Sequence, residues 1–239
     1  MDEERIEAVL SALRDRADPA RRAHAEGYIP SALEVLGVPA PGLRAVLRPL
    51  ARELRTEPLE RVLAVAHELV DTGIHEARQI AYELVGGRKD LIARLDAEAV
   101  EALGRGNDNW ASVDSFSVYV AGPAWRDGGV GDGDVLRWTG SPDRWWRRTA
   151  LVSTVALNQR SRGGRGDVPR TLAVCDALAA DAEPMVAKAL SWALRALSAV
   201  DAGSVRAFLA RHGDGIPALV RREVRNKLET GRKSGRRSR

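Results

Sequence analysis

A tryptophan and an aspartate lie four residues apart in the segment NDNWASVDS (residues 107–115), at Trp110 and Asp114. In an α-helix of about 3.6 residues per turn, this spacing places the indole and the carboxylate on the same face. A carboxylate next to apolar surface costs free energy unless it is paired, hydrated or used in chemistry. Asp114 is therefore a candidate catalytic group, and a hydrated surface acid is the alternative that the residue types leave open.

Other catalytic and metal-binding motifs are missing from the sequence. The chain has no Walker A loop, no GxGxxG segment after a strand and no GxSxG segment. Its four histidines show neither an HExxH motif nor the paired spacing of a zinc site. We therefore predict no bound metal and no cofactor. The segments left to carry chemistry are NDNWASVDS, DRWWRRTAL (residues 143–151) and KALSWALRAL (residues 188–197).

Charge is distributed unevenly along the chain. The net charge is +4, but residues 1–143 carry 17 Lys or Arg against 25 Asp or Glu, whereas residues 144–239 carry 20 against 8. Of the basic residues, 33 are Arg, which binds phosphate in a bidentate manner more readily than Lys. This polarity favours a polyanionic partner, with nucleic acid as the first candidate. A solvated basic surface with no partner is the alternative.

Hydrophobic residues recur at helical spacing along nearly the whole chain, and no segment alternates as a half-buried strand does. Gly and Pro residues such as Pro58, Gly73 and Gly106 separate the helical segments. Similar segments return about every 38 residues, which is close to the period of HEAT and armadillo repeats. We predict an all-α fold, a curved solenoid of HEAT-like helix pairs, with one domain over residues 1–230.

Three segments interrupt the helical pattern. Residues 121–134 are rich in glycine but lack the Glu that ends a calcium loop, so we predict a flexible connection. The segment QRSRGGRGD (residues 159–167) carries three Arg among glycines, and it is either a phosphate-binding loop or a mobile surface loop. The basic tail GRKSGRRSR (residues 231–239) has no apolar residue with which to pack, so we predict that it is disordered.

The sequence also indicates the compartment. Cys175 is the only cysteine, which excludes an intramolecular disulfide and favours a reducing environment. The N-terminus is charged, unlike a signal peptide, and no apolar run approaches the roughly 18 residues that span a bilayer. We expect a monomeric, cytoplasmic, nucleoid-associated protein with no membrane association.

The three segments together resemble the AlkD-type DNA alkylation repair family, which comprises bacterial DNA glycosylases built from HEAT-like repeats. The family patterns W-x-S-V-D-S, W-x-x-R-x-A and K-A-x-x-W-x-L-R occur here in order and at matching separations. The N-terminal segment 26–44 and the segment 220–228 are also similar to the family, so the resemblance covers roughly residues 5 to 230. The matched positions are Tyr28, Arg44, Trp110, Asp114, Trp145, Arg148, Lys188, Trp192 and Arg195.

This resemblance implies hydrolysis of the N-glycosidic bond of cationic N3- or N7-alkylated purines in duplex DNA. It implies that Asp114 stabilises positive charge on the deoxyribose and holds the attacking water. Trp110 and Trp192 would flank the sugar and the lesion with their electron-rich faces. The family further implies a monofunctional enzyme that cleaves without flipping the base, contrary to the usual mode.

The resemblance implies a set of DNA contacts as well. Arg148 would hold the phosphate beside the lesion, both as part of substrate binding and as a general DNA contact. The remaining DNA-binding positions that the family implies are Arg195, Arg44 and Tyr28.

One departure from the family lies at Pro184 and Met185, where the best-known members have an aromatic pair. This difference keeps open a self-resistance glycosylase that removes one bulky natural-product adduct, in place of general methylpurine repair. A non-catalytic HEAT-like module that binds DNA or protein also stays open, because fold alone does not decide function. Asp114 and the two tryptophans discriminate between the readings, since a scaffold requires none of them.

Overall fold

The computed structural model describes residues 2–234 of the chain. Over this range the prediction of an all-α fold is confirmed: the described residues form no strand, and an isolated parallel bridge joins Glu34 to Ile74. The chain divides into two compact units, residues 1–120 and residues 121–239. The single domain over residues 1–230 and its solenoid of HEAT-like pairs stay predictions.

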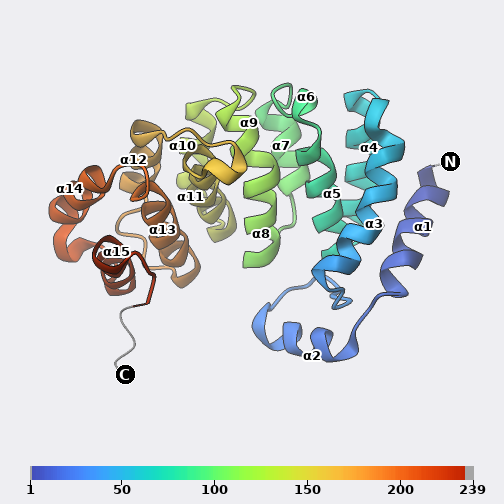
Figure 1. Ribbon diagram of the computed structural model, residues 1–239, viewed down its shortest axis with the longest axis horizontal. Coiled ribbons are helices and arrows are strands. Elements are labelled where there is room, and N and C mark those ends of the chain that lie inside the picture. Colours follow the sequence, from blue (N-terminus) through green and yellow to red (C-terminus); the bar gives the residue numbers. More distant parts are fainter. Residues whose placement is uncertain (1, 235–239) are drawn as a thin grey trace. The chain divides into compact units, whose positions relative to one another are not determined.

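The first unit consists of helices (Figure 1), whose buried side chains are mostly aliphatic. α4 packs along α5, and both α3 and α8 also contact α5. α5 is consequently the central helix of this unit, with buried residues on most of its surface. The helices are α1 (Asp2–Arg14), α2 (Pro19–Tyr28), α3 (Ala40–Glu53), α4 (Leu59–Asp71), α5 (His75–Gly87), α6 (Lys89–Ile92), α7 (Ala97–Gly104) and α8 (Trp110–Phe116).

A π-helical turn, Ser117–Ala121, continues directly from α8. Single π-helical turns are rare in proteins, but those that occur are often found at functional sites. Gly86 of α5 lies against this turn so closely that a Cβ atom there would be 2.5 Å from the Tyr119 carbonyl oxygen. Glycine is therefore required at residue 86 for α5 to approach the turn that follows α8.

The second unit is organised around α11, which is buried along most of its length. α9, α10, α12 and α13 all pack on α11, and α15 packs on α13 (Figure 1). The helices are α9 (Gly122–Arg126), α10 (Asp132–Thr139), α11 (Arg144–Asn158), α12 (Val168–Ala177), α13 (Pro184–Leu197), α14 (Ala202–His212) and α15 (Ala218–Thr230).

Many of these helices begin at a polar residue that caps the first turn. An aspartate or asparagine side chain at this position accepts a hydrogen bond from a backbone N–H group that has no partner within the helix. Each such cap stabilises its helix by about 1 kcal/mol. Capping residues of this kind are Asp18 (α2), Asp96 (α7), Asn109 (α8), Asp143 (α11), Asp167 (α12) and Asp201 (α14).

The prediction of a flexible connection over residues 121–134 is wrong at both ends, since α9 begins at Gly122 and α10 begins at Asp132. Residues Gly122–Arg126 form α9, and Trp125 is fully buried and donates a hydrogen bond from Nε1 to Asp132 Oδ1 at 2.7 Å. The π-helical turn that ends at Ala121 runs directly into α9, so Pro123 lies within a continuous helical stretch and does not mark a loop.

The first residues of the basic tail contact α15. Gly231 ends that helix with a φ of 72°, which is a left-handed conformation that glycine adopts without strain. Lys233 Nζ lies 3.4 Å from Glu223 Oε1, and its carbonyl oxygen accepts a hydrogen bond from Asn226 Nδ2. Residues 235–239 lie outside the described residues, so the disorder of the tail stays a prediction.

Candidate functional site

Trp110 and Asp114 both lie on α8, as their spacing predicts. Trp110 is the first residue of the helix and Asp114 is one turn further on, and both side chains are half-buried. Asn109 is the N-cap, and its Oδ1 accepts a hydrogen bond from the Ser112 backbone N–H group at 2.9 Å. The start of the helix, and with it the indole, is therefore set by a specific cap.

The cap residue belongs to a buried polar network. Asn109 is only 1% exposed, and its Nδ2 donates hydrogen bonds to Ser31 Oγ and Ser112 Oγ, both at 3.1 Å. Ser31 Oγ in turn donates to Asp108 Oδ1 at 2.5 Å, and the Ala32 backbone N–H group donates to Asp108 Oδ2. Because buried polar groups are costly to leave unpaired, these bonds hold the segment after α2 against the start of α8.

His75 connects the same network to α5. It is the first residue of that helix, is buried, and shares a hydrogen bond of 3.0 Å between Nδ1 and Ser112 Oγ. Burial lowers the pKa of His75 below its ordinary value, against the opposing charge of the neighbouring Glu76. The imidazole is thus favoured in its neutral form, which is suited to a structural hydrogen bond inside the protein.

Tyr28 lies beside Trp110 at the end of α2. The two rings are 5.4 Å apart between centroids with an interplanar angle of 78°, an edge-to-face arrangement. Trp110 Nε1 donates a hydrogen bond to the Tyr28 carbonyl oxygen at 3.3 Å, and the Tyr28 side chain is 62% exposed. The structure thus brings together two residues that the sequence places 82 positions apart.

Arg44 is exposed on α3, and its positive charge influences Glu83 of α5. Burial raises the pKa of Glu83, and the positive charge of Arg44 opposes this rise. The guanidinium is therefore close enough to Glu83 to influence its ionisation. The proposed contact between Arg44 and DNA stays a prediction.

Arg148 lies on α11 in the second unit and is mostly covered. Only 5% of the residue is exposed, and its Nη1 donates a hydrogen bond of 2.5 Å to the Met185 carbonyl oxygen at the start of α13. Met185 is one of the two residues that depart from the family pattern. The proposed phosphate contact of Arg148 stays a prediction. For this contact, a DNA phosphate has to reach a guanidinium that is mostly covered by the protein.

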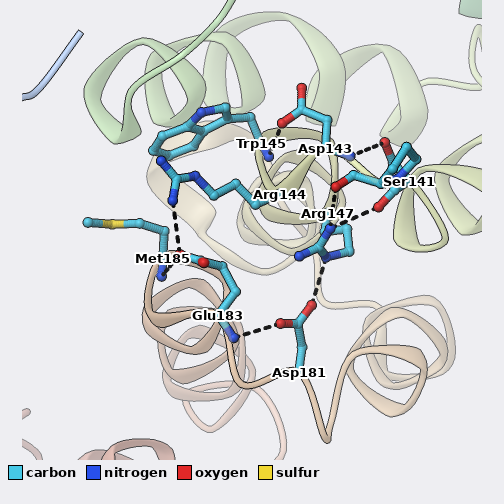
Figure 2. Close-up of polar contacts among 9 residues, drawn as sticks. Ser141, Asp143, Arg144, Trp145, Arg147, Asp181, Glu183 and Met185 are labelled. Atoms are coloured by element: carbon cyan, nitrogen blue, oxygen red, sulfur yellow. Dashed lines mark hydrogen bonds and ion pairs between the residues drawn. The ribbon is translucent and has the colours of Figure 1, made fainter.

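Ion pairs fix the first turn of α11 to the segment before α13 (Figure 2). Arg147 Nε donates a hydrogen bond to Asp181 Oδ2 at 2.8 Å, and its Nη1 donates to the Ser141 carbonyl oxygen at 2.9 Å. Arg144 lies with its guanidinium carbon 4.8 Å from the centre of the Trp145 ring and with Nη1 3.6 Å from Glu183 Oε1. These ion pairs thereby hold the start of α11 against the start of α13.

Trp192 and Arg195 lie on α13. Trp192 is half-buried, as Trp110 is. Arg195 Nε donates to Ser191 Oγ at 3.2 Å and lies 3.9 Å from Glu223 Oε2 on α15. Burial lowers the pKa of Arg195, and the charge of Glu223 opposes this effect. Arg195 is thus partly engaged in packing α13 on α15.

Several residues that shape the site were missed by sequence reasoning. Ser31, His75 and Asp108 fix α8, and Asp181 and Glu183 fix the start of α11. Asparagine is among the residue types that favour the N-cap position, and Asn109 is the N-cap of α8. No local pattern identifies Ser31 or His75, because their partners are 78 and 37 positions away.

The described residues contain no group of three or more His, Cys, Asp or Glu side chains arranged to hold a metal ion. Within the same range, the helices are too short or too polar to cross a membrane.

One comparison with known proteins identifies the family of this chain. A family model described as DNA alkylation repair enzyme matches residues 9–228. Among solved structures, a predicted DNA alkylation repair enzyme from Enterococcus faecalis matches with a TM-score of 0.68 and 19% sequence identity, covering 90% of this chain and 98% of that chain. At this identity the structural likeness shows the fold. The comparison with curated proteins found no match.

Proposed function

Because this chain belongs to the DNA alkylation repair enzyme family, we propose that it is a monofunctional DNA glycosylase for cationic N3- or N7-alkylated purines in duplex DNA. Family membership gives the chain a role in repairing alkylation damage, with DNA as its partner. The position of Asp114 carries the finer proposal. It is a half-buried carboxylate one turn from Trp110, on a helix whose start is fixed by buried hydrogen bonds.

The chemistry requires one well-placed carboxylate. An N3- or N7-alkylated purine is already positively charged, so it leaves without protonation by a general acid. As the bond from C1′ to the purine nitrogen breaks, its electron pair moves to the base and neutralises it, while positive charge develops on the deoxyribose. The fixed negative charge of Asp114 stabilises that cation more strongly than it stabilises the ground state.

Asp114 also orients the attacking water in this proposal. The carboxylate accepts a hydrogen bond from the water, whose oxygen forms the new bond to C1′. The water proton passes to the carboxylate and then to solvent. The products are a neutral free base and an abasic deoxyribose, so the atoms and charges balance without a metal or a cofactor.

The remaining matched residues would bind the substrate. Trp110 and Trp192 present ring faces to the cationic sugar and base, and such contacts are worth about 1–2 kcal/mol when water is excluded. Tyr28 supports Trp110 through the edge-to-face contact and the hydrogen bond from its indole. Arg148 would contact a phosphate next to the lesion, since an arginine binds phosphate through two parallel hydrogen bonds.

Cleavage without base flipping, which the resemblance to the AlkD-type family implies, is part of the same proposal. A half-buried carboxylate beside a half-buried indole favours approach to the sugar, whereas a flipped base needs a deep enclosing pocket. Such an enzyme would accept bulky adducts as well as methyl groups. Met185, whose carbonyl oxygen holds Arg148, is a position at which this chain could tune the accepted adduct.

Base release from defined lesions tests this proposal. Duplex DNA with 7-methylguanine, 3-methyladenine or a bulky N3-adenine adduct is incubated with the protein, and free base is measured against an enzyme-free control. We expect release of at least one of these bases and intact strands that break only on later treatment with alkali. DNA binding with no base release from any substrate would instead identify a non-catalytic scaffold. Release of the bulky adduct alone would identify a dedicated resistance enzyme.

A further inference from the structure

A basic hollow lies in the second unit, apart from the residues assigned above to catalysis. Its volume is about 720 Å³, and it is bordered by the segment 159–167, by the C-terminal part of α13 and by α15. Four of its lining side chains are cationic, and none of the described residues that line it is acidic. The cationic residues are Arg160, Arg165, Arg195 and Lys227.

The segment 159–167 is tightly packed on the body of the unit. Gly164 is buried against the end of α11, where a Cβ atom would lie 2.7 Å from the Leu157 carbonyl oxygen. Gly166 has a φ of 94°, and a Cβ atom there would lie 2.6 Å from Val200 Cγ1. The loop can therefore pack this closely on the unit only with glycine at both positions.

Hydrogen bonds from both sides fix the same loop. Arg126 of α9 donates from Nη1 to the Arg162 carbonyl oxygen at 2.5 Å. At the other end, Asn158 Oδ1 accepts a hydrogen bond from the Asp167 backbone N–H group at 3.1 Å. The backbone of the loop that carries Arg160 and Arg165 is therefore held by hydrogen bonds at Arg162 and at Asp167.

The loop arginines keep their charge exposed. Arg160 and Arg165 are both exposed, and among the described residues neither guanidinium is engaged in a hydrogen bond or a close ion pair. The pKa of Asp127 is lowered mainly by its hydrogen bond from Arg126, and the charge of Arg165 contributes further. On the opposite side, Lys227 Nζ donates to the Gly231 carbonyl oxygen at 2.8 Å.

We propose that this hollow binds the phosphodiester backbone of a DNA strand, at a site separate from the phosphate contact of Arg148. Two exposed arginines on a fixed loop can each form paired hydrogen bonds with phosphate oxygens. Arg195 and Lys227 add positive charge on the opposite side. The choice of DNA rests on the proposed function, whereas the anionic ligand class follows from the two exposed loop arginines and from the absence of a carboxylate among the lining residues. The charge of Arg195 is partly offset by Glu223 on α15.

Equilibrium binding to undamaged duplex DNA tests this site without any catalytic readout. Affinity is measured over a range of NaCl concentrations for the wild type and for the double variant Arg160→Gln/Arg165→Gln. We expect the slope of log Kobs against log[salt] to become smaller in magnitude by about 1 for each arginine removed, and so by about 2 in the double variant. The variant Arg160→Lys/Arg165→Lys should retain most of the wild-type slope, since it keeps both charges.

The variant Arg206→Gln/Arg222→Gln is the matched control. It removes the same net charge from two exposed arginines of α14 and α15 that do not line the hollow. Its slope should stay close to that of the wild type, because neither arginine lines the hollow that the proposal assigns to the DNA backbone. Thermal unfolding of each variant checks that the fold is intact, and we expect melting temperatures close to the wild type.

The outcomes separate this proposal from the proposed function. An unchanged slope in the loop variant, with base release by the wild type, overturns the phosphate site and leaves the glycosylase standing. A reduced slope in the loop variant alone, with no base release, supports the phosphate site in a protein that binds DNA without cleaving it. Equal losses in the loop variant and the matched control would show general charge attraction and would overturn the site.

Discussion

The two units differ in net charge and in how they position their candidate functional side chains. Residues 1–120 carry 15 Lys or Arg against 21 Asp or Glu, whereas residues 121–239 carry 22 against 12. In the first unit, α8 is fixed by a hydrogen-bond network that contains the Asn109 amide, the His75 imidazole and the Asp108 carboxylate. In the second unit, exposed arginines project from a loop fixed by its glycines.

The functions proposed for the two units would account for this difference. A carboxylate that stabilises a transient cation must be placed accurately, and a buried hydrogen-bond network fixes geometry at the cost of tolerating few substitutions. A surface that grips a phosphate backbone needs charge and reach, and it tolerates side chains that move. Substitutions in the first unit should therefore affect stability and chemistry, whereas charge substitutions in the second should affect DNA binding.

The largest loss of stability is expected from Asn109→Ala. The substitution removes the α8 cap, worth about 1 kcal/mol, and leaves Ser31 and Ser112 short of buried partners, so we expect a loss of about 3 kcal/mol. Chemical denaturation measures this loss. Asn109→Ser keeps a capping oxygen and should recover about 1 kcal/mol. A loss below about 0.5 kcal/mol for Asn109→Ala, the level typical of a surface substitution, would show that the network does not hold α8.

A smaller loss is expected from Gly166→Ala in the loop of the second unit. The new methyl group would meet Val200 and would occupy a backbone with a φ of 94°, so we expect a loss of about 2 kcal/mol together with weaker DNA binding. Gly128→Ala is the matched control, because its φ is 91° and nothing lies within 4 Å of the new Cβ atom. If both variants lose the same stability, backbone strain alone explains the effect and the packing on Val200 contributes nothing.

A modest effect of pH is expected from His75. Burial lowers its folded-state pKa below the ordinary value of 6.5, so the unfolded state binds a proton that the folded state does not. This contribution is absent well above pH 6.5 and destabilises the fold as the pH falls below that value. The free energy of unfolding should therefore decrease from neutral to mildly acidic pH, and less steeply in His75→Gln. An equal decrease in the two proteins would assign the pH dependence to other groups.

Sequence reasoning located most helices because their apolar spacing is maintained by burial. The helical spacing of apolar residues continues through residues 143–157, and α11 spans Arg144–Asn158. Most residues of this helix are buried in the second unit. The segment 121–134 was misjudged because glycine and proline were both taken as loop signals. Trp125 was the stronger signal, since full burial of a large apolar side chain stabilises the fold by about 2–3 kcal/mol.

The candidate site was predictable only where its residues are close in the chain. The four-residue spacing of Trp110 and Asp114 predicted that both lie on one face of one helix, and both are on α8. Helical spacing of apolar residues likewise predicted a helix around Trp192, which lies on α13. The ring contact between Tyr28 and Trp110 depends on tertiary packing, so no periodicity reveals it. The covered position of Arg148, bonded to the Met185 carbonyl oxygen, likewise depends on how α11 packs against α13.

The single-turnover rate of base release by Asp114→Asn tests the central claim most directly. The substitution keeps the shape of the side chain and removes its negative charge, whereas Glu98→Gln removes an exposed charge from α7 as a control. With the enzyme-free rate subtracted, we expect 7-methylguanine release to fall about 10²–10³-fold in Asp114→Asn, the loss typical of one preorganised electrostatic group. DNA affinity should hold, and Glu98→Gln should match the wild type. Release by Asp114→Asn at the wild-type rate would contradict the proposed role of the carboxylate.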